Sequence, residues 1–281
     1  MRRARGTAVA IITISRGTFS GGKALAERLA ARLGYPCLSR EVVVEAAREF
    51  DISPEKLAEA MEKPAAAWRQ EYGERTRYLN YIRATLCERA IGGNLVYHGL
   101  AGHILLAGIS HVIRVRVIAD QESRINEAME RLHLGRREAL AKIEKDDMAR
   151  ANWTRFLYDV DWHDPTHFDI VLNLQHMSVD DACDVVSRMA ELECFKPTPA
   201  SRKALAELTL SSRIWAALAG DTRTASVEAC VASDDGVVTI IAIPGTGRSE
   251  DLVSTVTSVV ANVPGVREVR CQVGARPVTM K

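Results

Sequence analysis

A short glycine-rich segment with a lysine at its end, residues 17–24, is the clearest chemical feature of the sequence. Its spacing fits the GxxxxGK pattern of a loop that binds phosphate. Glycines let consecutive backbone N–H groups curve around a phosphate, and Lys23 can reach the outer oxygens. The alternative is a glycine-rich turn with a solvated lysine. The candidate nucleotide-binding residues are Arg16, Gly17, Thr18, Ser20, Gly21, Gly22, Lys23 and Ala24.

Position 24 departs from the usual pattern, in which a Ser or Thr hydroxyl binds Mg²⁺. Ala24 has no hydroxyl, so the metal would have to be held through water, Ser20 or Thr18. We name no protein residue as a metal ligand.

The elements on either side of this segment have the order that a phosphate-binding loop requires. Residues 8–15 are an apolar, β-rich run, and Leu25, Leu29 and Leu33 recur at helical spacing before Gly34. Further strands are predicted at 94–98, 112–119 and 167–175, with helices at 121–134, 136–152 and 178–193 between and after them. This alternation predicts an α/β fold, a parallel sheet flanked by helices.

The pattern changes after residues 196–204, which contain two prolines and are the best linker candidate. A helix at 208–218, strands at 226–232 and 237–243, a helix at 248–262 and a strand at 266–272 predict a small α+β domain of order αββαβ. Gly236 suits a tight hairpin turn. We therefore expect domains at 1–195 and 205–281.

Composition excludes several classes of protein. The 281 residues are 47% hydrophobic and 26% charged with a net charge of +1, which predicts a globular protein without the basic excess of a nucleic-acid binder. No run approaches the roughly 18 apolar residues of a membrane span. The six cysteines are scattered, which favours reduced thiols and a cytoplasmic location.

Two segments in order resemble the cytidylate-kinase-like family. Residues 12–35 are ITISRGTFSGGKALAERLAARLGY, and residues 144–182 contain a D-x-x-R helix followed by DWHDPTHFDIVLN. The resemblance covers about residues 11–190. It implies a P-loop fold, ATP as phosphoryl donor, Mg²⁺, and CMP or dCMP as the acceptor. It also implies catalytic roles for Lys23, for Asp147 and Arg150 at the D-x-x-R positions, and for Arg155 on the same lid.

Two positions depart from the family pattern where the acceptor should be recognised. Ser39 stands where an acidic residue is expected, with Glu41 as the nearest carboxylate, and Gly99 stands where the family has Arg. His98 or His103 could compensate, although a packed or surface histidine is the simpler interpretation. Asp161, Asp164 and Asp169 are either metal or base residues or ordinary turn residues.

From about residue 205 the chain resembles a BON-type domain, through DGVVT near residue 237 and VPGVREV near its end. Such domains are associated with phospholipid surfaces or small hydrophobic ligands, so the resemblance implies a partner or lipid-surface contact. A regulatory or dimerising module is the other interpretation.

Two functions of different classes follow. The first is ATP-dependent phosphoryl transfer to a nucleoside monophosphate. The alternative is a non-catalytic nucleotide sensor that signals through its C-terminal domain, in which Ala24, Ser39 and Gly99 mark lost chemistry.

Overall fold

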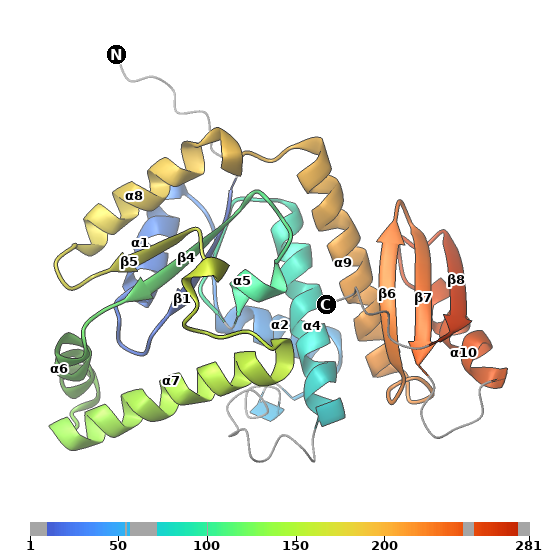
Figure 1. Cartoon of the computed structure of the whole chain (residues 1–281), viewed down its shortest axis with the longest axis horizontal. Helices are drawn as coiled ribbons and strands as arrows, with labels where there is room; N and C mark the ends of the chain where they lie inside the picture. Colours follow the sequence, from blue (N-terminus) through green and yellow to red (C-terminus); the bar gives the residue numbers. More distant parts are fainter. Residues whose placement is uncertain (1–9, 54, 57–71, 100, 244–249, 275–281) are drawn as a thin grey trace. The chain divides into compact units, whose positions relative to one another are not determined.

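The computed structural model describes residues 10–53, 55–56, 72–99, 101–243 and 250–274 (Figure 1). Within these ranges the chain forms two compact units. The first holds described residues 10–41 and 92–201, and the second holds those of 42–91 and 202–274.

The first unit is built on a five-stranded parallel sheet with the order β2-β3-β1-β4-β5. The strands are β1 (Ile11–Arg16), β2 (Cys37–Leu38), β3 (Leu95–Tyr97), β4 (Val112–Ile118) and β5 (Ile170–Asn173). β1 lies at the centre, between β3 and β4, where the strand order reverses. Ligands of open parallel sheets bind at the carboxyl ends of the strands near such a point. The predicted α/β fold is confirmed, and the glycine-rich loop lies where this rule places a ligand.

Helices precede or follow each strand of this sheet. They are α1 (Gly22–Leu33), α5 (Gly102–Leu105), α6 (Gln121–Leu132), α7 (Arg136–Tyr158) and α8 (Val179–Glu191), with short 3₁₀ turns η2 (Pro165–His167) and η3 (Glu193–Phe195). Helix α1 ends at Gly34, as predicted, because that glycine has φ 70° and its N–H donates to Ala30 O. The first turn of α8 is capped by Ser178, whose hydroxyl accepts from Asp181 N.

One face of the sheet is apolar and packs against α1 and α8 (Figure 1). Leu25 and Leu29 of α1 and Val186 of α8 are fully buried against it. The strand residues of this face are Ile12, Ile14, Val96, Ile113, Val115, Val117 and Leu172. Burial of these side chains supplies the main hydrophobic stabilisation of the unit.

The other face of the sheet is polar near the carboxyl ends of the strands. Thr13 lies in register with Arg114, and Ser15 with Arg116. Helix α5 covers this face closely, since a Cβ on Gly102 would lie 2.5 Å from Tyr97 Cδ1. The alternation of Val and Arg along β4 thus divides an apolar from a polar face.

The second unit joins three long helices to a three-stranded sheet. The helices α2 (Arg40–Glu49) and α9 (Pro199–Gly220) each begin in the first unit, and α4 (Tyr72–Ile91) lies wholly in the second. The sheet consists of β6 (Glu228–Asp234), β7 (Val237–Ile243) and β8 (Glu268–Val273), with α10 (Glu250–Ala261) between the last two strands. β6 and β7 are antiparallel, and β7 and β8 are parallel.

This arrangement confirms the predicted αββαβ order of the C-terminal segment. Helix α9 begins at Pro199, within the segment in which we expected a linker, so 199–204 are helical. The domain boundaries themselves stay a prediction.

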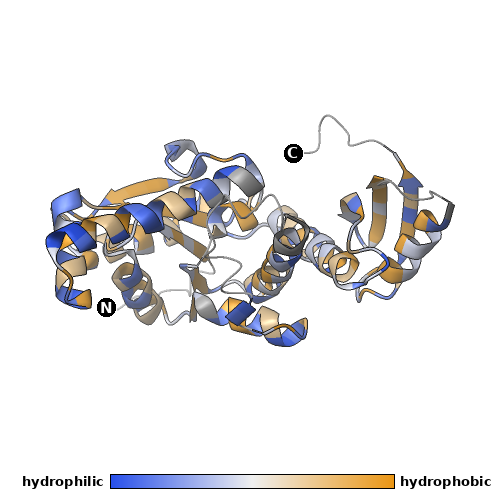
Figure 2. Ribbon diagram, turned by 90° about the horizontal axis from the view of Figure 1, so that it is seen from below, coloured by the Kyte–Doolittle hydropathy of each residue, from blue (hydrophilic) through white to orange (hydrophobic). Residues whose placement is uncertain are grey.

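A hydrophobic core lies between this small sheet and helices α9 and α10. Val238, Ile240 and Val256 are fully buried in it, and Figure 2 shows hydrophobic residues along the strands. Over the part of the chain that the structure describes, no helix is long and apolar enough to cross a membrane.

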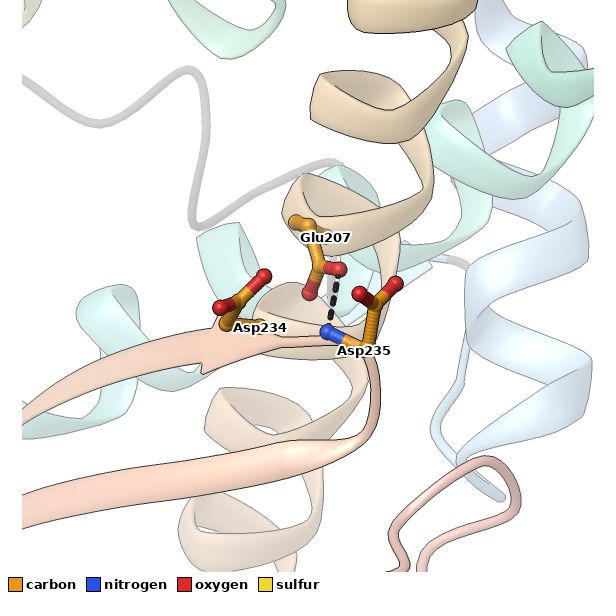
Figure 3. A group of neighbouring side chains, drawn as sticks. All are labelled: Glu207, Asp234 and Asp235. Atoms are coloured by element: carbon orange, nitrogen blue, oxygen red, sulfur yellow. Dashed lines mark hydrogen bonds between the residues drawn. The ribbon is translucent and has the colours of Figure 1, made fainter.

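The turn between β6 and β7 is anchored to α9. Asp235 and Gly236 have φ of 46° and 78°, the left-handed pair that a two-residue hairpin requires. Glu207 Oε1 accepts from Asp235 N at 2.7 Å (Figure 3), and Lys203 Nζ lies 2.6 Å from Asp234 Oδ1 and 2.8 Å from Asp235 Oδ2. Lys203 pairs with the carboxylates of Asp234 and Asp235, and Glu207 accepts from the turn's backbone, so these contacts hold the turn against α9.

Candidate functional site

The glycine-rich loop follows β1 and enters α1 in a conformation that only glycine adopts easily. Gly21 has φ 83°, and a Cβ there would lie 2.8 Å from Leu174 Cδ1. A Cβ on Gly22 would lie 2.6 Å from Arg16 Cβ. Ser20 Oγ donates to Gly17 O at 2.9 Å, which closes the loop internally. The loop therefore has the tight shape that brings backbone N–H groups close to a phosphate.

Asp147 of α7 is bonded directly to this loop. Thr18 N and Thr18 Oγ1 both donate to Asp147 Oδ1, each at 2.8 Å. Arg150, one helical turn further along α7, donates from NH1 to Thr18 Oγ1 at 2.6 Å and to Asp147 Oδ1 at 3.1 Å. The structure thus brings together Thr18, Asp147 and Arg150, three of the residues predicted from the sequence.

Arg124 of α6 completes the cluster. Its Nε donates to Thr18 O at 2.8 Å, and its NH2 pairs with Asp147 Oδ2. Burial raises the pKa of Asp147, but the hydrogen bonds from Thr18 and Arg124 outweigh it and hold that pKa below its ordinary value. Asp147 is therefore ionised at neutral pH and fixes two guanidinium groups beside the loop.

Arg16 adds positive charge on the other side of the loop. Its NH1 donates to His98 O at 3.5 Å. Burial, and then repulsion from Arg150, lower the pKa of Arg16 to about 10, so it remains protonated at neutral pH. Three guanidinium groups with one half-buried carboxylate leave a net positive charge here, which favours a bound phosphate.

Lys23 lies on the first turn of α1 with its side chain 58% exposed. Its Nζ lies 3.6 Å from Glu27 Oε1. Because an exposed ion pair of this kind contributes only about 0–1 kcal/mol, the ammonium group can turn to a phosphate at little cost. Ala24 follows on the same helix and offers only a methyl group.

The loop fits nucleotide phosphates better than it fits direct coordination of Mg²⁺. Of the two hydroxyls that we considered as metal ligands, Thr18 Oγ1 donates to Asp147 and also accepts from Arg150, whereas Ser20 Oγ only donates, to Gly17 O, and offers one oxygen. The Asp147 carboxylate is already bonded to Thr18 and Arg124. The described residues of the loop therefore do not form a set of Mg²⁺ ligands. Phosphate oxygens and water would supply most of the coordination.

Arg155 is placed differently from Arg150. It lies further along α7 with its side chain 71% exposed, and its NH2 is 3.9 Å from Asp161 Oδ2. This contact directs Arg155 to the turn after α7, and its catalytic role stays a prediction.

The aspartates of the turn after α7 have structural partners. Asp161 Oδ1 accepts from His163 N at 2.9 Å, and Asp164 Oδ1 accepts from Thr166 N at 2.8 Å at the start of η2. Asp169 Oδ2 accepts from Arg114 N at 2.7 Å. These contacts support the interpretation of all three as turn and strand residues.

The positions that depart from the family pattern also have structural explanations. Ser39 N donates to Glu41 Oε2 at 2.6 Å, so Glu41 caps the start of α2. A Cβ on Gly99 would lie 2.4 Å from Tyr97 Oη, so the Tyr97 ring fills the space of a side chain there. His98 is buried, and burial followed by repulsion from Arg16 lowers its pKa to about 4, which keeps it neutral.

A buried polar layer beside the loop was not predicted from the sequence. Ser15 Oγ and His103 Nδ1 are 2.8 Å apart, and burial lowers the pKa of His103 to about 3. Arg116 NH1 donates to Trp162 O at 2.5 Å, and its guanidinium carbon lies 5.4 Å from the Trp162 ring centre and 5.5 Å from that of Phe168. The alternating Val and Arg residues of β4 were the signal for this layer. It fixes the turn after α7 against the sheet.

An open groove of about 610 Å³ lies beside α7 and the turn that follows it. Its lining residues are Glu144, Asp147, Met148, Ala151 and His163. Because Asp147 is also bonded to Thr18, the groove adjoins the loop.

The fold, with a glycine-rich loop between β1 and α1, is an α/β fold of the nucleotide-kinase kind. The model of the cytidylate kinase-like family matches residues 11–176, which are more than half of the chain. The chain therefore belongs to the cytidylate kinase-like family, which confirms the resemblance over this part. None of the curated proteins compared with the chain matches it.

Two solved structures are similar to the first part of the chain. An uncharacterized protein from Eubacterium ventriosum is 22% identical with a TM-score of 0.50, and the match covers 65% of this chain and 98% of that one. TT1252 from Thermus thermophilus is 21% identical with a TM-score of 0.38, over 65% of this chain and 97% of that one. At such identities the likeness concerns the fold alone, and it rests on the first of the two.

Proposed function

We propose that this protein transfers a phosphoryl group from Mg²⁺-ATP to a nucleoside monophosphate, with CMP or dCMP as the expected acceptor. The observation that carries the proposal is that Arg124 and Arg150 both bond to Thr18 of the loop and to one half-buried carboxylate, Asp147. Membership of the cytidylate kinase-like family supports it.

In phosphoryl transfer the protein mainly positions the reactants and stabilises the charge on the transferred group. In the proposed complex the loop N–H groups of 21–24, at the N-terminus of α1, bind the donor phosphates, and Lys23 pairs with their outer oxygens. Arg150, beside Thr18, stabilises the charge on the transferring group. Asp147 holds the Arg150 guanidinium in place. Arg155 closes over the same group when α7 moves toward the nucleotides.

A coupled assay of ADP release tests this proposal. The protein would be supplied with Mg²⁺-ATP and each common nucleoside monophosphate in turn, with Lys23→Ala as the control. We expect ADP release that depends on CMP or dCMP and is lost in the variant. ADP release that does not depend on any acceptor, or that survives in Lys23→Ala, would contradict the proposal.

The second candidate is a nucleotide sensor without catalysis, favoured by the missing hydroxyl at Ala24 and by Tyr97, which fills the space beside Gly99. This candidate predicts that ATP binds with an affinity that depends on Lys23, whereas no acceptor gives turnover. Calorimetric titration with ATP, run beside the coupled assay, separates the two functions.

We also propose that the C-terminal αββαβ segment is a BON-type domain that regulates the kinase-like part or contacts a phospholipid surface. The order of its elements and the Asp235–Gly236 turn support this assignment. Co-sedimentation of the full chain with anionic phospholipid vesicles tests the surface contact, and protein that stays in the supernatant would leave regulation as the remaining role.

A further inference from the structure

Arg16, the last residue of β1, is half-buried and forms no ion pair with a carboxylate of the described residues. Its NH1 donates to a neutral acceptor, the carbonyl oxygen of His98, at 3.5 Å. Arg124 and Arg150, by contrast, both bond to the Asp147 carboxylate. A half-buried guanidinium without a counter-ion lowers the stability of the fold, so its presence points to a ligand that carries negative charge.

The aliphatic stem of Arg16 lies along the start of α1. A Cβ on Gly22 would lie 2.6 Å from Arg16 Cβ and 2.7 Å from Arg16 Cδ, so the missing side chain of Gly22 makes room for the stem. Gly22 is the first residue of α1, where backbone N–H groups are available to phosphates. Beyond this point the guanidinium reaches His98, which follows β3. Arg16 therefore passes beside the place that donor phosphates would occupy.

The charges of Arg16 and Arg150 repel one another. Burial, and then repulsion from Arg150, lower the pKa of Arg16 to about 10, whereas the Glu27 carboxylate opposes this shift less strongly. Lys23 Nζ lies 3.6 Å from Glu27 Oε1, so that carboxylate already has a partner. Arg150 donates to Thr18 Oγ1, in the first part of the loop, and Arg16 packs on its end. An anion bound at the loop would be attracted by both guanidinium groups and would reduce their repulsion.

The phosphoryl group in transfer is an anion of the charge and shape that this pair of arginines suits. In the proposed reaction the bond from the γ phosphorus to the bridging oxygen of ATP breaks, and its electron pair stays on ADP. An oxygen of the acceptor phosphate, which reacts as a dianion, forms the new bond with its own electron pair, so no proton is transferred. The oxygens of the moving group carry the charge meanwhile, and guanidinium forks stabilise it. Because Ala24 has no hydroxyl for a metal, the arginines supply more of this stabilisation.

We propose that Arg16 is a catalytic residue that binds the phosphoryl group in transfer, together with Arg150. The inference rests on the proposed function, because it assigns a further residue to that reaction. The stem of Arg16 is held between β1 and the start of α1, so the guanidinium is ordered before a nucleotide binds. Such preorganisation reduces the entropy that is lost when the phosphoryl group is bound.

Calorimetric titration with ATP and with ADP, both with Mg²⁺, tests the proposal without requiring turnover. Arg16→Met keeps an apolar stem beside Gly22 and removes the charge. It should raise the Kd for ATP about tenfold, the size expected for one hydrogen bond to a charged group, and leave the Kd for ADP unchanged, because ADP lacks the transferred group. Arg28→Met is the matched control, since Arg28 is an exposed residue of α1 that pairs with Asp180. The control should change neither constant.

Two further measurements separate a catalytic from a structural role. In the coupled assay Arg16→Met should lower kcat by a factor on the order of 10³, as is typical for an arginine that stabilises the transferred group. Arg16→Lys should restore only part of this loss, because an ammonium group keeps the charge but not the planar fork. In thermal unfolding without ligand, Arg16→Met should have a Tm equal to or above that of the unchanged protein, since a half-buried charge without a counter-ion is removed.

Three results would each overturn the proposal. They are an unchanged Kd for ATP in Arg16→Met, an equal weakening of ATP and ADP binding, and a lower Tm of the variant, which would show that Arg16 stabilises the fold. Failure of the proposed function gives a different result. In that case no acceptor gives turnover with any form of the protein, but ATP still binds and binds more weakly to Arg16→Met. Arg16 would then bind the γ-phosphate of a nucleotide sensor, and its catalytic role would be wrong.

Discussion

Thr18 of the loop and Asp147 of α7 are joined by two hydrogen bonds of 2.8 Å, from the backbone N–H and from the hydroxyl of the threonine to one carboxylate oxygen. The first part of a phosphate-binding loop is thereby tied to a helix that also carries Arg150. The position of α7 and the shape of the loop are therefore linked through Asp147 and through the bond from Arg150 to Thr18.

Asp147→Asn should lower the free energy of unfolding by about 1–3 kcal/mol at pH 7, because Arg124 loses its half-buried charge partner. Because the pKa of Asp147 in the folded protein lies below the ordinary value of 3.8, the carboxylate stabilises the protein above pH 3.8, and this stabilisation is lost as the pH falls through the folded pKa. Urea unfolding at several pH values measures this. A deficit that stays constant down to pH 3 would exclude the charge as its cause.

Gly21→Ala should destabilise the protein by about 1–2 kcal/mol and weaken ATP binding, because the loop needs φ 83° at this position and the new Cβ would lie 2.8 Å from Leu174. Gly92→Ala is the matched control, since a Cβ there meets no atom within 4 Å. Thermal melts with and without ATP compare the two. Equal behaviour of the two variants would show that the loop tolerates a side chain.

Lys23→Ala should raise the Kd for ATP at least about tenfold while the free energy of unfolding changes by less than about 0.5 kcal/mol. The lysine side chain is 58% exposed, and its ion pair with Glu27 is long at 3.6 Å, so folding gains little from it. Calorimetry and thermal unfolding of the same preparation give both values. A large loss of stability would mean that the ammonium group has a structural role.

Arg116→Met should lower the free energy of unfolding by about 1–3 kcal/mol. The Trp162 carbonyl loses its hydrogen-bond donor, and the Trp162 and Phe168 rings lose their contact with the guanidinium group. Arg131→Met is the control, since that arginine is 55% exposed and pairs only on the surface with Glu127. Denaturant unfolding distinguishes them. A similar loss of unfolding free energy in both variants would show that the buried layer contributes no more to stability than a surface ion pair.

Local sequence patterns predicted the elements around the site. Three features were predictable because each needs a glycine with a left-handed backbone conformation at one position. They are the loop, the end of α1 at Gly34 and the turn at Gly236. Helix α5 has four residues and β2 has two. Elements this short show no hydrophobic periodicity, so they were not predicted from the sequence. Helix α7 extends to Tyr158 rather than about residue 152, and buried Thr154 on it donates to Arg150 O.

The partners within the site could be predicted only in part. The resemblance indicated Asp147 and Arg150, but neither spacing nor composition shows that Asp147 bonds to Thr18, because the two are 129 positions apart. The filled space beside Gly99 depends on the Tyr97 rotamer, which is a property of packing. Contacts of this kind follow from the three-dimensional arrangement of distant strands and helices.

The pairing of β1 with β4 has a consequence for how reliably the chain folds. Ser15 faces Arg116 and Thr13 faces Arg114, while Val115 points to the opposite, apolar face. A slip of one position would turn both arginines into the core against α1 and α8, at a cost of several kcal/mol for each unpaired charge. The two arginines therefore disfavour a shifted register of β1 and β4. The correct register places the loop at the carboxyl end of the sheet.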